Sequence, residues 1–171
     1  MAEINFDQLG FAFVPLYAKH KKTPKMFLRY YKVDSGANRT TISRDWLLEL
    51  GYDEAWIKSG KRLEGNARPT VASGLPMDDC YEVVLPEIHI GDWVGYNWPV
   101  LTSLSLPFKY LLGTDSMQFF KWVFDYENGT CKFELIPGKR KLLFNQQEQS
   151  IHAVDETGQQ TDCKPAHFSV E

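Results

Sequence analysis

Residues 33–37 read VDSGA, and they place one aspartate in a Ser-Gly turn at the end of the apolar run MFLRYYKV (26–33). A carboxylate in such a turn adds little to packing, but it is well placed for chemistry on a loop held by a rigid strand. A second patch, residues 111–116, reads LLGTDS and again follows a short apolar run with glycine and aspartate. These two patches make Asp34 the candidate functional residue.

The segments around the first patch predict strands and one short helix. The apolar runs 11–18 and 26–33 flank a polar loop that contains proline, which is typical of an antiparallel hairpin. After the turn, Ser43 can cap a helix of about two turns that ends before Gly51. This order indicates a strand, then the Asp34 turn, then a helix.

Two further hairpins are predicted later in the chain. Gly91-Asp92 joins the runs 81–90 and 93–104, and such a pair suits a tight turn. Asn128-Gly129 predicts a hairpin with a two-residue loop, in which Asp125 would face Lys132 and Phe124 would face Phe133. That register gathers the apolar side chains on one face and makes Cys131 a core residue.

Length and composition indicate one ordinary globular domain. The chain has 171 residues, 43% of them hydrophobic and 24% charged, with a formal net charge of −3. This charge gives no reason to expect nucleic acid as a partner, and no apolar window is long enough to suggest a membrane. Three widely spaced cysteines and the absence of a signal pattern at the first residues favour a cytoplasmic protein.

The composition changes near residue 137. Residues 1–136 are rich in apolar runs, whereas residues 137–171 are polar, rich in glutamine and only sparsely apolar. We therefore expect one domain over 1–136 and a C-terminal tail over 137–171 that is extended or partly disordered.

The segments VDSGANRTTIS (33–43) and LPFKYLLGTDSM (106–117), in this order, resemble the retropepsin-like aspartic proteases. The resemblance covers roughly residues 10–136. It implies an all-β fold, a retropepsin-like closed β-barrel or sandwich with one or two short helices, which acts as a symmetric dimer. It also implies an aspartic endopeptidase without metal or other cofactor, whose substrate is an extended peptide or protein.

The resemblance assigns roles to individual residues. Asp34 would be catalytic, and Ser35, Gly36 and Gly113 would support the catalytic loop. A flap centred on 68–76 would cover the cleft. The residues expected to contact substrate are Ala37, Asn38, Thr70, Val71, Ala72, Ser73 and Gly74.

The chemistry requires a second aspartate, and the chain does not supply one in a second D-[ST]-G turn. Asp115 has methionine where glycine would be needed, so we interpret it as a residue at the start of a helix. A second copy of Asp34 must then come from another subunit, which makes a homodimer the expected partner. The alternative is a dimer of the same shape that binds a peptide or protein partner without cutting it.

Overall fold

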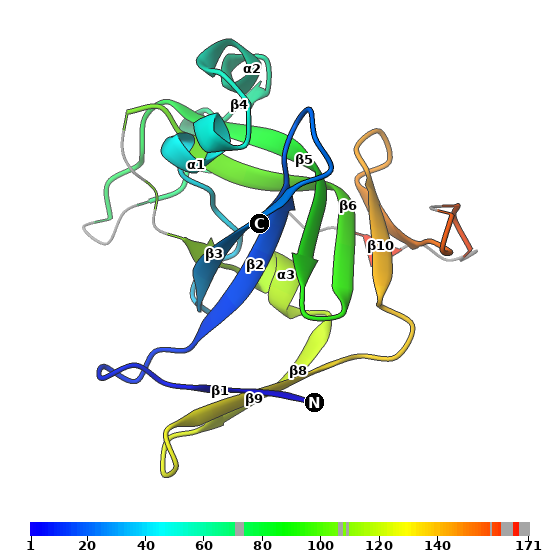
Figure 1. Ribbon diagram of the computed structural model, residues 1–171. Helices are drawn as coiled ribbons and strands as arrows, with labels where there is room; N and C mark the ends of the chain where they lie inside the picture. Colours follow the sequence, from blue (N-terminus) through cyan, green and yellow to red (C-terminus); the bar gives the residue numbers. More distant parts are fainter. Residues whose placement is uncertain (71–73, 106–107, 109, 158, 162–165, 168–171) are drawn as a thin grey trace.

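The computed structural model describes residues 1–70, 74–105, 108, 110–157, 159–161 and 166–167. Within these ranges strands dominate, with three short α-helices and one 3-10 turn, in agreement with the all-β prediction (Figure 1). The strands are β1 (Ala2–Asn5), β2 (Phe13–Lys19), β3 (Met26–Val33), β4 (Lys61–Arg62), β5 (Cys80–Ile90), β6 (Trp93–Ser103), β7 (Leu111–Leu112), β8 (Phe120–Asp125), β9 (Thr130–Leu135), β10 (Lys141–Asn145), β11 (Ser150–Ala153) and β12 (Ala166–His167). The helices are α1 (Arg44–Glu49), α2 (Glu54–Lys58), α3 (Thr114–Met117) and the 3-10 turn η1 (Gly65–Ala67).

The larger sheet has the strand order β12-β11-β10-β6-β5-β2-β3-β7, and β4 pairs with β5. Its centre is the long hairpin of β5 and β6, in which Ile90 pairs with Trp93 across the predicted Gly91-Asp92 turn. The predicted β2–β3 hairpin is also present and is antiparallel. The parallel pair of β3 and β7 then brings the two sequence patches side by side.

The strands of this sheet do not close into the expected barrel in the described part of the chain, where β7 and β12 remain its two ends. Instead, the extended segment 40–42 lies between β7 and β6. Thr41 N donates to Leu111 O over 3.0 Å, and Ile42 N donates to Leu101 O over 2.8 Å. Segment 40–42 therefore connects β7 to β6 through a few backbone hydrogen bonds, whereas a closed barrel would need a paired strand at this place.

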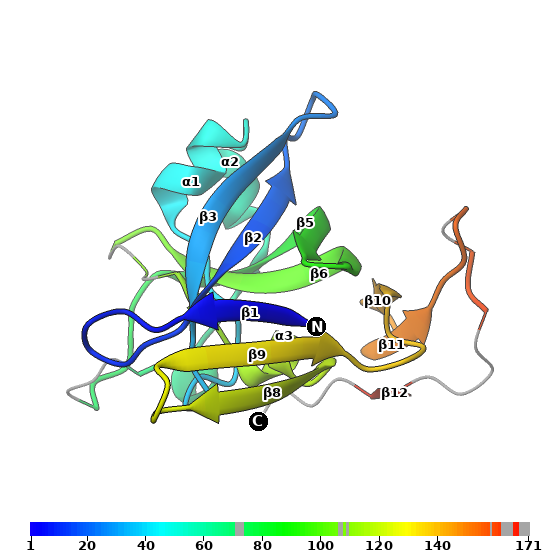
Figure 2. The ribbon, with the colours of Figure 1, turned by 60° about the horizontal axis from the view of Figure 1, so that its bottom comes forward.

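A smaller sheet of order β1-β9-β8 crosses one end of the molecule (Figure 2). The predicted register of its β8–β9 hairpin is wrong by two residues, because Asp125 pairs with Thr130 across a four-residue loop, 126–129. The Asp125 carboxylate accepts a hydrogen bond from Asn128 N over 3.0 Å, and this contact stabilises the longer loop. A shift of two residues leaves each side chain on its face, so Cys131 is fully buried as predicted, and burial raises its pKa to about 11.

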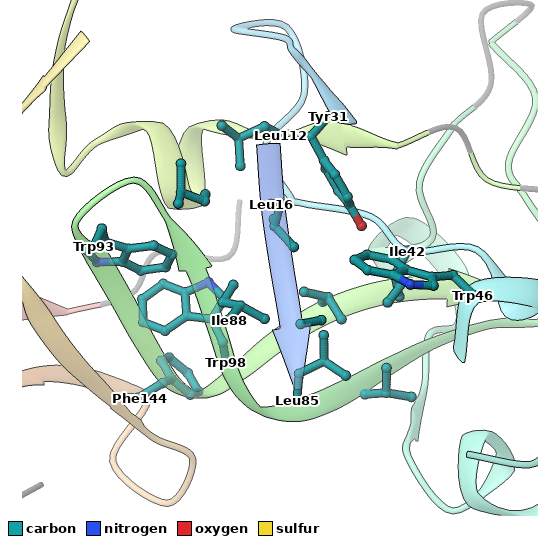
Figure 3. Packing of buried hydrophobic residues seen from close by; sticks show 14 of the residues in the cluster. Leu16, Tyr31, Ile42, Trp46, Leu85, Ile88, Trp93, Trp98, Leu112 and Phe144 are labelled. Atoms are coloured by element: carbon teal, nitrogen blue, oxygen red, sulfur yellow. The ribbon is translucent and has the colours of Figure 1, made fainter. Parts of the chain in front are cut away.

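The core lies between the large sheet, the helices and the small sheet. Figure 3 shows Trp93, Trp98 and Phe144 at one end of it and Trp46 and Tyr31 at the other. The predicted helix α1 contributes Trp46, and its Ser43 cap accepts a hydrogen bond from Trp46 N over 3.1 Å. Helix α2 was not predicted, although Asp53 caps it in the same way.

Strands β10 and β11 lie in the segment that the sequence analysis assigns to a polar tail. β10 runs parallel to β6, with Leu142 opposite Gly95. Leu142, Phe144 and Ile151 are each at most 3% exposed and belong to the main core. The structure therefore places these three apolar side chains in the same core as the large sheet.

None of the helices among the described residues is long and apolar enough to cross a membrane.

Candidate active site

Strand β3 ends at Val33, directly before Asp34. Val33 N donates to Ala12 O over 2.9 Å, and Asp34 N donates to Leu112 O over 3.0 Å. The backbone on both sides of β3 is thus held up to the last residue before the turn. Asp34 is half-buried, whereas Ser35 and Gly36 are exposed, so the carboxylate lies at the rim of a fixed scaffold.

The residues after β3 form a tight turn, and residues 34–40 are called the Asp34 loop below. Ala37 N donates to Asp34 O over 3.1 Å, and Gly36 N donates to the carboxylate oxygen Oδ1 of Asp34 over 2.9 Å. A Cβ atom at Gly36 would lie 3.2 Å from that oxygen. Glycine at this position lets the backbone approach and orient the carboxylate.

Gly113 lies directly against the Asp34 loop. A Cβ atom there would come within 2.6–2.7 Å of the backbone atoms of Arg39, a distance that no side chain can tolerate. Gly113 N donates to Thr40 Oγ1 over 3.2 Å, and Thr114 N donates to Ala37 O over 2.8 Å. The structure therefore brings the second sequence patch into backbone contact with the first.

Asp115 lies in the first turn of α3, where the sequence places it, and its side chain is 2% exposed. Thr40 N and Thr40 Oγ1 donate to the two carboxylate oxygens over 2.9 and 2.7 Å. Arg39 Nε lies 3.7 Å from the same carboxylate. Burial raises the pKa of Asp115, while these hydrogen bonds and the nearby guanidinium act in the opposite direction.

Arg39 joins this buried cluster to strand β5. Its Nη2 atom donates to Glu82 Oε2 over 2.8 Å, and both side chains are largely buried. Arg39, Thr40 and Glu82 were not predicted as parts of the site. A charged or hydroxyl residue in a polar stretch carries no signal that the fold will bury it, so only the tertiary contacts identify them.

Ala37 and Asn38, which were predicted to contact substrate, also anchor helix α3 through their backbones. Ala37 O accepts from Thr114 N, and Asn38 O accepts from Asp115 N over 3.3 Å. Ala37 is half-buried and Asn38 is exposed. Both residues follow Asp34 on the same loop.

The predicted flap is described in part, because Val71, Ala72 and Ser73 lie outside the described residues. Thr70 and Pro76 form an antiparallel bridge, and Met77 N donates to Pro69 O over 2.8 Å. Thr70 and Gly74 are exposed, and Gly74 has a φ of +83°. The two arms of this segment thus pair as a hairpin would.

In the described ranges, no group of three or more histidine, cysteine, aspartate or glutamate side chains could hold a metal ion.

No protein-family model matches the sequence. No curated protein matches it either. Among solved structures, the chain is similar to a retropepsin-like aspartic protease from Rickettsia conorii, with a TM-score of 0.55 and 18% sequence identity. The match covers 76% of this chain and 86% of the other, and at this identity it shows a shared fold.

Proposed function

We propose that this chain, with its retropepsin-like fold, is one subunit of a homodimeric aspartic endopeptidase in which the two copies of Asp34 form one catalytic pair. The observation that carries the proposal is the arrangement at Asp34. A fixed strand, a glycine turn that donates to the carboxylate, and Gly113 against the same loop hold one carboxylate at the surface. A single carboxylate of this kind leaves half of the chemistry to a second subunit.

Hydrolysis of a peptide bond by this route needs a base and an acid at the same time. Two carboxylates about 3 Å apart cannot both ionise, so the pair shares one proton. The ionised Asp34 would take a proton from a bound water, which attacks the scissile carbonyl carbon. The protonated Asp34 of the other subunit would donate its proton to the carbonyl oxygen, which gives a tetrahedral diol. The first Asp34 would then pass the proton it took from water to the amide nitrogen as the C–N bond breaks, while the second Asp34 takes back one hydroxyl proton, so that the carboxyl product forms and the pair again shares one proton.

The surroundings of Asp34 suit an extended peptide. Ala37 and Asn38 would contact its backbone, and the segment 68–76 would close over it as a flap. An extended chain between the flap and the Asp34 loops would be held by main-chain hydrogen bonds, with its side chains in alternating pockets. Ser35 would brace the two loops against each other through its hydroxyl.

The test compares wild type with Asp34→Asn on a mixture of peptides between pH 4 and 7, with cleavage read by mass spectrometry. The asparagine side chain in this variant keeps an acceptor for Gly36 N but cannot act as a base, so we expect cleavage by wild type alone. Equal circular dichroism spectra and sedimentation of the two proteins would assign the loss to chemistry. Cleavage of the same bonds by Asp34→Asn would contradict the proposal.

A second candidate function is a dimer of the same fold that binds peptide without cutting it. The observation that favours it is Asn38, because the family often has aspartate at this position and the charge is absent here. Peptide binding by a dimeric wild type that cleaves no bond would support this alternative. It would assign the Asp34 loop to recognition and not to hydrolysis.

A further inference from the structure

Strand β8 has an open edge in the described part of the chain. It pairs with β9 on one side, while β1 occupies the far side of β9, so β8 is an outer strand of the small sheet (Figure 2). Apolar side chains at this strand and its turn are exposed: Val123 by 55%, Phe124 by 39% and Tyr126 by 74%. A strand edge with exposed apolar side chains is a template for pairing with another chain.

The backbone groups that point out of this edge follow from the ladder between β8 and β9. Ile136 N donates to Phe119 O over 2.9 Å, which makes this pair a hydrogen-bonded one. Hydrogen-bonded and non-bonded pairs alternate along an antiparallel ladder, so Lys121, Val123 and Asp125 bond to β9. The N–H and C=O groups of Trp122 and Phe124 therefore face away from β9, toward the open edge.

The turn after β8 contacts the segment of chain that leads to the strand carrying Asp34. The ring of Phe6, beyond the end of β1, lies 5.1 Å from the ring of Tyr126. The chain then turns, and Ala12 O accepts the hydrogen bond from Val33 N, next to Asp34. Phe11, beside Ala12, is 38% exposed. The turn at the end of β8 is thus connected, through residues 6–12, to the backbone hydrogen bond next to Asp34.

We infer that β8 pairs antiparallel with β8 of a second copy of this chain, across a two-fold axis at Val123. The inference rests on the proposed function, since that function needs the Asp34 of a second copy. Trp122 would exchange backbone hydrogen bonds with the partner's Phe124, and the two three-stranded sheets would join into one of six strands. Because β1 already pairs with β9 of its own chain, this interface requires no exchange of N-terminal strands.

Charge favours an axis at Val123 over an axis at Lys121 or Trp122. An axis at Val123 places Lys121 directly opposite the partner's Asp125, and the symmetry produces this pair of opposite charges twice. An axis at Lys121 would instead place two lysines opposite each other, which is unfavourable. An axis at Trp122 would leave Lys121 opposite valine. The arrangement at Val123 also covers the most exposed apolar side chain within β8.

The first test is a disulfide at the axis. In a non-bonded antiparallel pair the two Cα atoms are about 4.5 Å apart, which a disulfide can bridge. We expect Val123→Cys to form a covalent dimer under mild oxidation. Wild type controls for the native cysteines, of which Cys80 and Cys131 are buried. Glu3→Cys, an exposed position on β1 at the opposite side of the small sheet, should form no covalent dimer.

The second test removes the outward N–H of Phe124. Phe124→Pro deletes it without removing a hydrogen bond to β9, and Phe124→Ala removes the ring but keeps the N–H. Because the two-fold axis doubles the loss, Phe124→Pro should weaken dimerisation by roughly tenfold to a hundredfold relative to Phe124→Ala, measured by sedimentation. Equal far-ultraviolet circular dichroism spectra would show that both variants keep the sheet.

The outcomes separate this inference from the proposed function. One outcome would overturn this inference alone: wild type is dimeric, Val123→Cys forms no covalent dimer, and Phe124→Pro dimerises as well as Phe124→Ala. The dimer interface would then lie elsewhere, and the proposed function would stand. If wild type remains monomeric at tens of micromolar with and without peptide, both are overturned.

Discussion

At the scale of single residues, the Asp34 loop depends on a close approach that only glycine permits. Gly113 has the backbone of Arg39 within 2.7 Å of where a Cβ would be, and backbone cannot move aside as a flexible side chain can. Gly36 differs, because the nearest atom to its missing Cβ is the Asp34 carboxylate oxygen at 3.2 Å. The two glycines therefore have different sensitivities to the same substitution.

We predict that Gly113→Ala lowers the free energy of unfolding by about 2–3 kcal/mol, the usual cost of overpacking a tight site. Urea unfolding measures this loss. Gly36→Ala is the matched control, and we expect it to cost less than about 1 kcal/mol because its neighbour is a side chain that can shift by a few tenths of an ångström. Equal unfolding midpoints for wild type and Gly113→Ala would show that the two patches are not packed as described.

Asp34, Gly36 and Gly113 are apparent from the sequence because they lie in short patterns whose chemistry is local. The Arg39–Glu82 pair is not, because its members are 43 residues apart and each alone is an ordinary charged residue. No sequence pattern identifies Thr40 either, although it donates two hydrogen bonds to Asp115. A sequence pattern identifies what a turn requires, whereas buried polar contacts depend on which segments the fold brings together.

At the scale of elements, α3 is tied to the Asp34 loop through a carboxylate whose pKa burial raises from its ordinary value of 3.8. At a pH between 3.8 and the higher pKa of Asp115 in the folded protein, the carboxyl is protonated in the native state but ionised in the unfolded chain. The Asp115 carboxyl therefore stabilises the folded protein at low pH, and this stabilisation is lost as the pH rises through its pKa in the folded protein.

We predict that Asp115→Asn removes this dependence. The difference in unfolding free energy, wild type minus Asp115→Asn, should fall as the pH rises above 3.8 and become constant once Asp115 is ionised in both states. Urea unfolding of both proteins from pH 3 to 7 measures it. A difference that rises with pH over this range would mean that the hydrogen bonds of Thr40 outweigh the effect of burial.

The β8–β9 hairpin shows how an element can be predicted in kind but not in register. Asn128-Gly129 correctly indicates a turn, and the alternation of apolar residues correctly indicates the buried face. Registers two residues apart share the same faces, so the apolar pattern cannot choose between them. The choice depends on the Asp125 carboxylate, which stabilises the longer loop through Asn128.

At the scale of the whole molecule, the segment after residue 137 contributes to the core. Its average composition is polar, but burial alternates along strand β10, with Leu142 and Phe144 buried and their neighbours half-buried. Few apolar residues are needed to cover one side of Trp98, and average composition does not reveal them. The strand pairing with β6 is also long-range, so no local pattern predicts it.

We predict that Phe144→Ala lowers the free energy of unfolding by about 4 kcal/mol, the usual cost of removing a buried aromatic ring. Leu143→Ala, at the half-buried position beside it, should cost about 1 kcal/mol. Chemical denaturation of the two variants checks the contrast. Similar small losses for both would mean that β10 does not pack on the core.

The proposed active site needs Asp34 from each of two chains, and mixing wild type with Asp34→Asn tests this requirement. After subunit exchange at fixed total concentration, chains pair at random, and only dimers with two aspartates should cleave peptide. An equal mixture should then retain about one quarter of the wild-type activity, and activity should follow the square of the wild-type fraction. A linear decline, with about half of the activity in the equal mixture, would show that each chain works alone and would contradict an active site shared by two subunits.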